Sequence, residues 1–278
     1  VVKPLFFAGG NIGKLAVCGT VNDLSMTGAV PRYLSMGLIL EEGFPIADLK
    51  KIVHTMRQAA DEAGIYIVTG DTKVVGRGAA DGIFINTAGI GDILPGTDIS
   101  PKRVKPGMDI ILSGYIGDHA AAIMASRHSL ELPDSIKSDC APLCGLTQAM
   151  LNVAPHIAVL RDPTRGGVAA VLNEIAGQSG TGILIEEEAL PVRPEVQGVC
   201  DILGFDPLYL ANEGKLIAFC ASEDTPKILT VMRAHRYGQD ARVIGHTTAE
   251  AAGQVGLKTA IGGIRVVDMP LGNLVPRI

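Results

Sequence analysis

Two segments near the start of the sequence combine acids, lysines and glycines in a pattern typical of sites for metal–nucleotide complexes. The segment GGNIGKLAVCGTVNDLSMTGA carries Lys14 and Asp23, and the segment IVTGDTK carries Asp71 and Lys73. Carboxylate oxygens are ligands that Mg²⁺ prefers, lysines meet phosphate oxygens, and glycines let backbone N–H groups approach an anion. The sequence contains no GxxxxGKS or GxxxxGKT run, so the predicted site would hold phosphates on a scaffold other than a P-loop.

Each of these acids and lysines also has an ordinary structural interpretation. Asp23 could be a solvated acid at a helix end, but an Asn22-Asp23 pair inside an apolar helix is costly to bury without partners. Asp71 directly follows a predicted strand, where ligand groups gather in α/β units, and an Asx-turn would equally explain it. Lys73 could be a surface lysine, or it could neutralise phosphate or transfer protons beside a metal-binding acid.

Two turns in the second half of the sequence add anion-binding and acid–base groups. The run DPTRGG begins at Asp162, follows an apolar strand and precedes a helix, so the helix N-terminus and Arg165 could hold an anion. A helix cap by Asp162 or Thr164 would explain the same run. The run NEGK contains Glu213, which could serve as a general base if its pKa is tuned; the alternative is a surface turn.

The composition describes a protein with an aliphatic core. The 278 residues are 47% hydrophobic but only 4% aromatic, include 34 glycines and carry a net charge of −5. The length predicts two domains, and the charge gives no reason to expect nucleic-acid binding. No apolar run reaches the length of about 18 residues that a membrane span needs. The cysteines form no CxxC pair, which favours free thiols in a reducing cytoplasm over disulfides. The histidines lack metal-ligand spacing, which argues against a zinc site.

The hydrophobic pattern alternates between helices and strands and so predicts two α+β units joined near residue 100. Asn11 can cap a helix that ends near Thr27, and residues 45–63 have the three- and four-residue spacing of an amphipathic helix. Prolines and glycines mark 95–107 as the linker. Strands are predicted at VVKP, PRYLSMGLILE, IYIVTGD, GIFINTAGIGDIL, MDIILSG, IAVLR and KLIAFC, and further helices near 118–128, 142–153 and VAAVLNEIAGQSG.

The motifs closely resemble the HypE family of hydrogenase maturation proteins along the whole sequence. The resemblance rests on PLFFAGGNIGKLAVCGTVNDLSMTGA, YLSMGLILEEGFP, IVTGDTKVV, INTAGIG, SGYIGDH, LRDPTRGGVAAVLNEIA, LANEGKL and the ending VPRI. HypE proteins are related to aminoimidazole ribonucleotide synthetase, selenophosphate synthetase and thiamine-monophosphate kinase, which share a fold and an ATP site.

The resemblance implies a two-domain synthetase fold of the α+β class. An N-terminal domain, expected at residues 1–97, would pair its sheet with that of a second subunit in a homodimer. A C-terminal α+β domain, expected at 104–268, would pack beside it, and 269–278 would form an extended tail. ATP and Mg²⁺ would lie in a groove near the dimer interface.

The activity that the resemblance implies is that of a carbamoyl dehydratase. HypF would deliver a carbamoyl group to the sulfur of a C-terminal cysteine, and ATP would be used to convert the thiocarboxamide to a thiocyanate. The cyano group would then pass to iron on the HypC–HypD complex, as a ligand for [NiFe]-hydrogenase. The family pattern extends beyond both ends of this sequence: a cysteine follows Pro-Arg-Ile, and a glycine-rich segment with an aspartate precedes Val1.

The site residues follow from this activity as expectations. Asp23 and Asp71 would hold Mg²⁺. Glu213 and Lys73 would take protons from the amide nitrogen. The nucleotide would contact a larger set of residues, Lys14, Asn22, Asp23, Asp71, Thr72, Asp162, Thr164, Arg165 and Gly166. Two alternatives stay open, namely another synthetase or kinase of the superfamily, such as selenophosphate synthetase, and a scaffold that binds nucleotide and partners without turnover.

Overall fold

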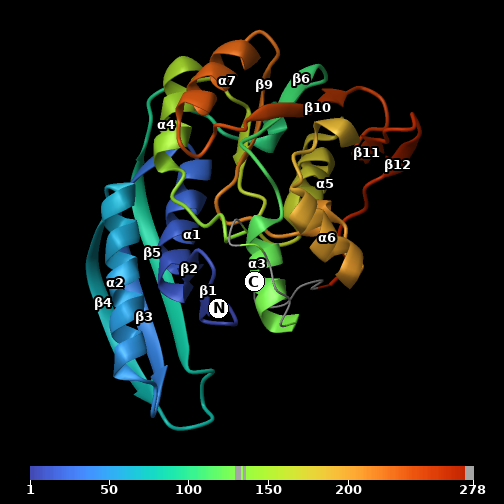
Figure 1. Ribbon diagram of the computed structural model, residues 1–278. Helices are drawn as coiled ribbons and strands as arrows, with labels where there is room; N and C mark the ends of the chain where they lie inside the picture. Colours follow the sequence, from blue (N-terminus) through green and yellow to red (C-terminus); the bar gives the residue numbers. More distant parts are fainter. Residues whose placement is uncertain (129–132, 134–135, 273–278) are drawn as a thin grey trace.

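The computed structural model describes residues 1–128, 133 and 136–272, and it is built around two large sheets (Figure 1). The N-terminal sheet has three strands in the order β4-β3-β5. The central strand β3 (Ala29–Glu41) pairs in parallel with β4 (Tyr66–Val75) and antiparallel with β5 (Ile83–Ile93). A short hairpin of β1 (Phe6–Phe7) and β2 (Gly10–Asn11) precedes this sheet.

Two helices cover one face of the N-terminal sheet, and their ends follow the predicted caps. In α1 (Ile12–Met26) the Asn11 side chain accepts hydrogen bonds from the N–H groups of Gly13 and Lys14, which satisfies two free donors of the first turn. In α2 (Ile46–Ala63) Pro45 precedes the first turn, and Gly64 ends the helix with a φ of 68°. The predicted amphipathic helix and its boundaries are thus confirmed.

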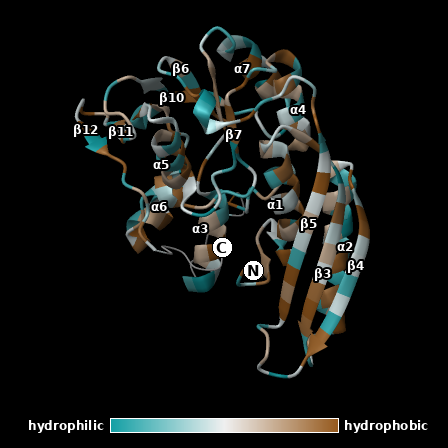
Figure 2. Cartoon of the chain, turned by 180° about the vertical axis from the view of Figure 1, so that it is seen from behind, coloured by the Kyte–Doolittle hydropathy of each residue, from teal (hydrophilic) through white to brown (hydrophobic). Residues whose placement is uncertain are grey.

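The other face of the N-terminal sheet is covered by no element that the structure describes. Side chains alternate along β3, so that Leu38 and Leu40 pack under the helices while Tyr33 and Ile39 point outward and are exposed. Across from Tyr33 lie Tyr66 on β4, 70% exposed, and Ile90 on β5. Figure 2 shows brown hydrophobic segments alternating with white and teal ones along these strands at the flank of the molecule.

The C-terminal sheet has seven strands in the order β12-β11-β8-β10-β6-β9-β7, and only β11 and β8 pair in parallel. Its strands are β6 (Met108–Leu112), β7 (Val159–Arg161), β8 (Gly182–Glu186), β9 (Ile217–Ala221), β10 (Arg242–Thr248), β11 (Val255–Lys258) and β12 (Ile264–Val266). The helices of this half are α3 (Asp118–His128), α4 (Cys144–Val153), α5 (Gly167–Ser179), α6 (Pro194–Leu203) and α7 (Thr225–Ala234), with 3₁₀ turns at Pro101–Arg103, Glu187–Ala189 and Pro207–Tyr209.

Two hydrophobic layers enclose the seven-stranded sheet because its central strands are buried on both faces. On β9, Ile217 and Phe219 pack with α5, whereas Ala218 and Cys220 pack with α4 and α7. This period of two in a continuous apolar run is the pattern of a strand buried between two helical layers. The predicted helices near 118–128 and 142–153 are confirmed as α3 and α4.

Two local predictions are wrong, and one helix is missing from the predictions. The strand predicted to end before Asp71 continues to Val75, because β4 pairs with β3 along its whole length and Gly70 does not interrupt it. VVKP forms no strand. Helix α6 was not predicted, although Pro194 at its first turn and Gly204 at its end are ordinary boundary signals.

Candidate functional site

Three predicted carboxylates, those of Asp23, Asp162 and Glu213, lie near enough for their charges to affect one another, where α1, the turn after β7 and the segment before β9 meet. Burial raises the pKa of Asp162 to about 6, and the nearby charge of Asp23 adds to this rise. Burial also raises the pKa of Glu213 well above its usual value, with Asp162 and Asp23 among the charges that contribute. Like charges that perturb one another in this way favour the binding of a cation or of protons.

Arginines lie beside this acidic cluster, which we define as Asp23, Asp162 and Glu213. Partial burial raises the pKa of Asp23, and the charges of Arg161 and Arg165 oppose that rise. The Arg161 guanidinium pairs with the Glu174 carboxylate on α5 at 2.7 Å, whereas Arg165 is exposed. The site therefore offers acids for a cation and an exposed guanidinium for an anion within one region.

The turn between β7 and α5 is built for a close approach of its backbone. Gly166 and Gly167 have φ angles of 75° and 62°, which residues with a side chain rarely adopt. A Cβ on Gly167 would lie 2.5 Å from the Leu208 carbonyl oxygen, so only glycine fits. Among the described residues no side chain caps the first turn of α5, and the Thr164 N–H donates to the Asp162 carbonyl at 2.9 Å. This uncapped N-terminus behind a glycine turn can receive phosphate oxygens.

Glu213 lies at a crossing of several chain segments. The neighbouring Asn212 is fully buried, accepts the Gly117 N–H at 2.7 Å and donates to the Pro163 carbonyl at 3.0 Å. These bonds tie the Glu213 segment to the start of α3 and to the turn that contains Asp162. Glu213 itself is 9% exposed, so the predicted surface turn is excluded.

Asn22 and Lys14, both predicted to contact nucleotide, have protein partners. The Asn22 amide is buried, donates to the carbonyls of Ala141 and Glu213 at 3.1 and 3.3 Å, and accepts the Leu143 N–H at 2.8 Å. Both ends of the Asn22 amide thus have partners within the protein, and its contact with nucleotide stays a prediction. Lys14 is half-buried and its ammonium donates to the Gly9 carbonyl at 3.2 Å.

Asp71, Thr72 and Lys73 lie on β4 and not beside the acidic cluster. Asp71 is opposite Gly37 and Lys73 is opposite Ile39, so both belong to the outward face of the N-terminal sheet. Helix α1, which carries Asp23, covers the other face. One chain therefore does not bring Asp71 and Asp23 together, and the predicted Mg²⁺ site cannot be assembled from both within it.

The structure adds residues that the sequence reasoning missed. Asp139 accepts the Glu213 N–H at 3.0 Å and the Lys215 ammonium at 3.1 Å, and Arg161 neighbours Asp23. Asp139 lies in a polar, irregular stretch with no motif of its own, so nothing in the sequence indicated it. Arg161 directly precedes the DPTRGG run and could have been included with that motif.

Within the described part of the chain, no three histidine, cysteine, aspartate or glutamate side chains are already arranged as a metal site. The acidic cluster nevertheless fits a cation in its chemistry, because a positive charge would relieve the repulsion that helps raise the pKa values of Asp162 and Glu213. The exposed Arg165, the glycine turn and the uncapped α5 likewise fit the phosphates of a nucleotide.

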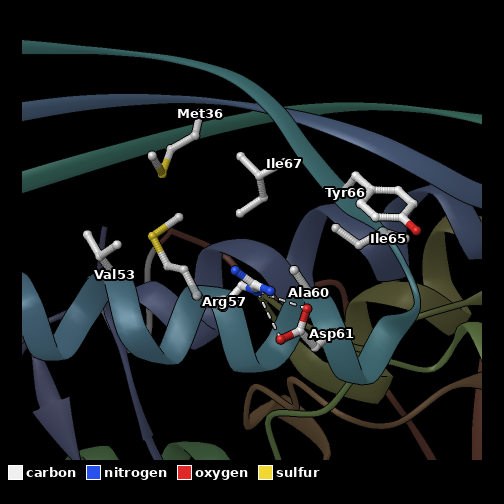
Figure 3. A pocket seen from close by; sticks show the side chains of 9 residues that line it. Met36, Val53, Arg57, Ala60, Asp61, Ile65, Tyr66 and Ile67 are labelled. Carbon is white, nitrogen blue, oxygen red and sulfur yellow. Dashed lines mark hydrogen bonds and ion pairs between the residues drawn. The ribbon is translucent and has the colours of Figure 1, made fainter.

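A cavity of about 440 Å³ lies elsewhere, between α2 and the strands β3 and β4 (Figure 3). Met36, Met56 and Ile67 line it, and Arg57 and Asp61 form an ion pair at its edge with a distance of 3.0 Å. None of the predicted site residues lines this cavity. It is therefore separate from the acidic cluster.

In the described residues no helix is both long and apolar enough to cross a membrane.

Known families and proteins match this chain closely. Residues 1–93 match the family described as AIR synthase related protein, N-terminal domain, and residues 105–258 match the corresponding C-terminal domain. Carbamoyl dehydratase HypE of Rhodobacter capsulatus is 54% identical over 278 residues, which is 100% of this chain and 82% of that protein.

Two solved structures share the fold. The crystal structure of hydrogenase maturation protein HypE in complex with ATP has a TM-score of 0.95 at 50% identity, covering 99% of this chain and 84% of that one. A HypE–HypF complex has a TM-score of 0.93 at 52% identity, with 97% of this chain and 88% of that one covered. The two-domain synthetase fold is confirmed, and the chain belongs to the HypE family of carbamoyl dehydratases.

Proposed function

We propose that this protein is an ATP-dependent carbamoyl dehydratase that converts a C-terminal cysteine thiocarboxamide to a thiocyanate and so supplies cyanide ligands for [NiFe]-hydrogenase. The observation that carries the proposal is the acidic cluster beside the glycine turn, in a chain 54% identical to a carbamoyl dehydratase. Dehydrating an amide requires that its oxygen become a leaving group and that its nitrogen lose protons. The cluster and the turn provide for these two needs in one place.

ATP and Mg²⁺ are the cofactors of this proposal, and the relative whose structure contains ATP supports the nucleotide. When bound, the nucleotide supplies the phosphoryl group that turns the amide oxygen into a leaving group. The uncapped start of α5, Thr164, Arg165 and Gly166 would hold phosphate oxygens. Asp23, with Asp162 close by, would hold the cation and keep the phosphates in place.

Glu213 is the proposed general base for the amide nitrogen. Burial first, and neighbouring acids second, raise the pKa of Glu213, which makes its carboxylate a stronger base than that of an exposed glutamate. Among the described residues none donates a hydrogen bond to its carboxylate. The side chain is therefore free to accept a proton from the substrate. Positioned proton transfer of this kind contributes roughly 10²- to 10⁴-fold to a rate.

The segment before the tail runs toward this site. The Asn173 amide donates to the Val267 carbonyl at 2.9 Å, and the Tyr209 hydroxyl donates to the Asp268 carbonyl at 3.0 Å. A Cβ on Gly166 would lie 3.0 Å from Pro270, so the chain passes over the glycine turn. These contacts support the proposal that a C-terminal thiocarboxamide reaches the nucleotide, while residues 273–278 of the predicted tail lie outside the described residues.

A homodimer would reconcile the positions of Asp71 and Lys73 with a single site. Both lie on the outward face of the N-terminal sheet, where the apolar side chains of Tyr66 and Ile90 are 70% and 66% exposed. A second copy packed on that face would bury it and would place the β4 strands at the interface near which the family resemblance puts the nucleotide groove. We propose that Asp71, Thr72 and Lys73 act in the nucleotide site across such an interface.

The remaining assignments follow from the family. HypF is the proposed carbamoyl donor, supported by the HypE–HypF complex of a relative, and the HypC–HypD complex is the proposed acceptor of the cyano group. We propose a cytoplasmic location, and domains at residues 1–97 and 104–268, close to the two family matches.

The test is the mass of the full-length protein after carbamoylation by HypF and addition of Mg-ATP. The proposal predicts loss of one water, dependent on the terminal cysteine and abolished in Asp23→Asn. ATP consumption without this loss would favour another phosphoryl acceptor, such as selenide. Partner binding with neither event would favour a scaffold.

A further inference from the structure

The main chain of Glu213 is held on both sides by groups that the proposed chemistry does not use. Its N–H donates to the Asp139 carboxylate at 3.0 Å. Its carbonyl accepts from the Asn22 amide at 3.3 Å and from the Ala141 N–H at 3.4 Å. We name Asn22, Asp139 and Ala141 the Glu213 clamp. It fixes the peptide on both sides of a side chain that is itself left free.

Asp139 is anchored firmly enough to act as a reference point. Its side chain is 3% exposed and pairs with Lys215 at 3.1 Å. Burial alone would raise the pKa of Asp139, but Lys215, His119 and the Glu213 N–H together outweigh it, so the pKa is lowered and the carboxylate is ionised. A hydrogen bond from a backbone N–H to an ionised carboxylate is stronger than one to a neutral acceptor.

Gly214 shows how closely the two segments cross. A Cβ at this position would lie 1.8 Å from the carbonyl oxygen of Asp139, so no other residue fits without moving the backbone. The Lys215 ammonium also donates to the Gly214 carbonyl at 3.3 Å. Glu213 is therefore followed by a residue whose backbone lies directly against Asp139, and Glu213, Gly214 and Lys215 all contact Asp139.

We infer that Asp139, anchored by Lys215, is a positioning residue that sets the Glu213 carboxylate against the substrate amide. The inference rests on the proposed function, because it assigns Asp139 a part in the dehydration through Glu213. A misplacement of about 1 Å can cost on the order of 100-fold in rate. Asp139 needs no contact with nucleotide or substrate for this role.

The test compares Asp139→Ala and Asp139→Asn in single-turnover dehydration by the full-length carbamoylated protein. Alanine removes the acceptor for the Glu213 N–H and should lower the rate about 10- to 100-fold at saturating Mg-ATP. The apparent ATP affinity should stay within about 2-fold. Asparagine keeps an acceptor oxygen and should recover part of the rate. Lys215→Met/Asp139→Ala avoids an unpaired buried ammonium and should show the same loss if folding is intact.

A double-mutant cycle with Glu213→Gln separates positioning from general structural damage. If Asp139 acts through Glu213, Asp139→Ala should cost little more once Glu213 is glutamine. Asp224→Asn is the matched control, since it breaks an ion pair with Lys227 beyond the far end of β9. Full additivity, or a normal rate in Asp139→Ala, would overturn the inference. A wild-type protein that does not dehydrate its tail would instead overturn the proposed function.

Discussion

At the residue scale, Glu213 is the proposed base, and burial and neighbouring acids raise its pKa. Glu213→Gln should slow dehydration roughly 10²- to 10⁴-fold and leave ATP binding nearly unchanged, because the side chain acts on the amide and not on the phosphates. The wild-type rate should fall as the pH decreases, and the midpoint of this fall should lie above the pKa of an ordinary glutamate. Single-turnover rates across pH check both points, and a normal rate in Glu213→Gln would refute the assignment.

Asp162 gives a second residue-scale prediction, on stability. Its pKa rises from 3.8 to about 6 on folding, through burial first and Asp23 second. The folded state therefore holds a proton that the unfolded state has lost, so stability decreases as the pH rises from 3.8 through about 6. Asp162→Asn should remove this loss and stabilise the nucleotide-free protein at pH 7 by at most about 3 kcal/mol.

Urea unfolding of the Asp162→Asn variant and of the wild type measures this effect at two pH values. One is pH 7, and the other lies below the pKa of Asp162 in the unfolded chain. The two proteins should differ at neutral pH and converge in acid. The same variant should bind Mg-ATP more weakly, as expected when a charged site is retained for function at the expense of stability. An identical pH dependence of the two free energies of unfolding would contradict the raised pKa.

At the element scale, the outward face of β3, β4 and β5 is the proposed dimer interface. Ile90→Glu places a charge in the middle of this face and should convert a dimer to a monomer, because burying an unpaired carboxylate is costly. Ile202→Glu on α6 is the control, since Ile202 is 69% exposed away from the sheet. Analytical sedimentation measures the oligomeric state of both variants. A dimeric Ile90→Glu protein would argue against this interface.

The elements also show what the sequence could predict. Helices α1 and α2 follow from local signals, the Asn11 cap and the Pro45 and Gly64 boundaries. The extent of β4 did not follow, because Gly70 resembles a strand end and only pairing with β3 carries the strand past it. Local chemistry determines caps and turns, whereas the length of a strand depends on a partner distant in sequence.

At the scale of the whole molecule, the candidate site combines residues that sequence patterns found and one that they could not. Asp23, Asp162 and Glu213 were predicted from motifs, and the structure brings them together from three distant segments. Asp139 could not be predicted, because its role arises only where residues about seventy positions apart cross at Gly214. Asn22 donates a hydrogen bond to the Glu213 carbonyl at this same crossing, and its contact with nucleotide stays a prediction.

The separation of Lys73 and Glu213 within one chain leads to the most direct test of the account, a complementation experiment between two inactive variants. Lys73→Met and Glu213→Gln should each abolish most dehydration alone. If each site uses Lys73 of one copy and Glu213 of the other, a mixed dimer contains one intact site. An equimolar, re-equilibrated mixture should then regain about one quarter of the wild-type rate. A mixture that stays as inactive as either variant would contradict a dehydratase site shared between two chains.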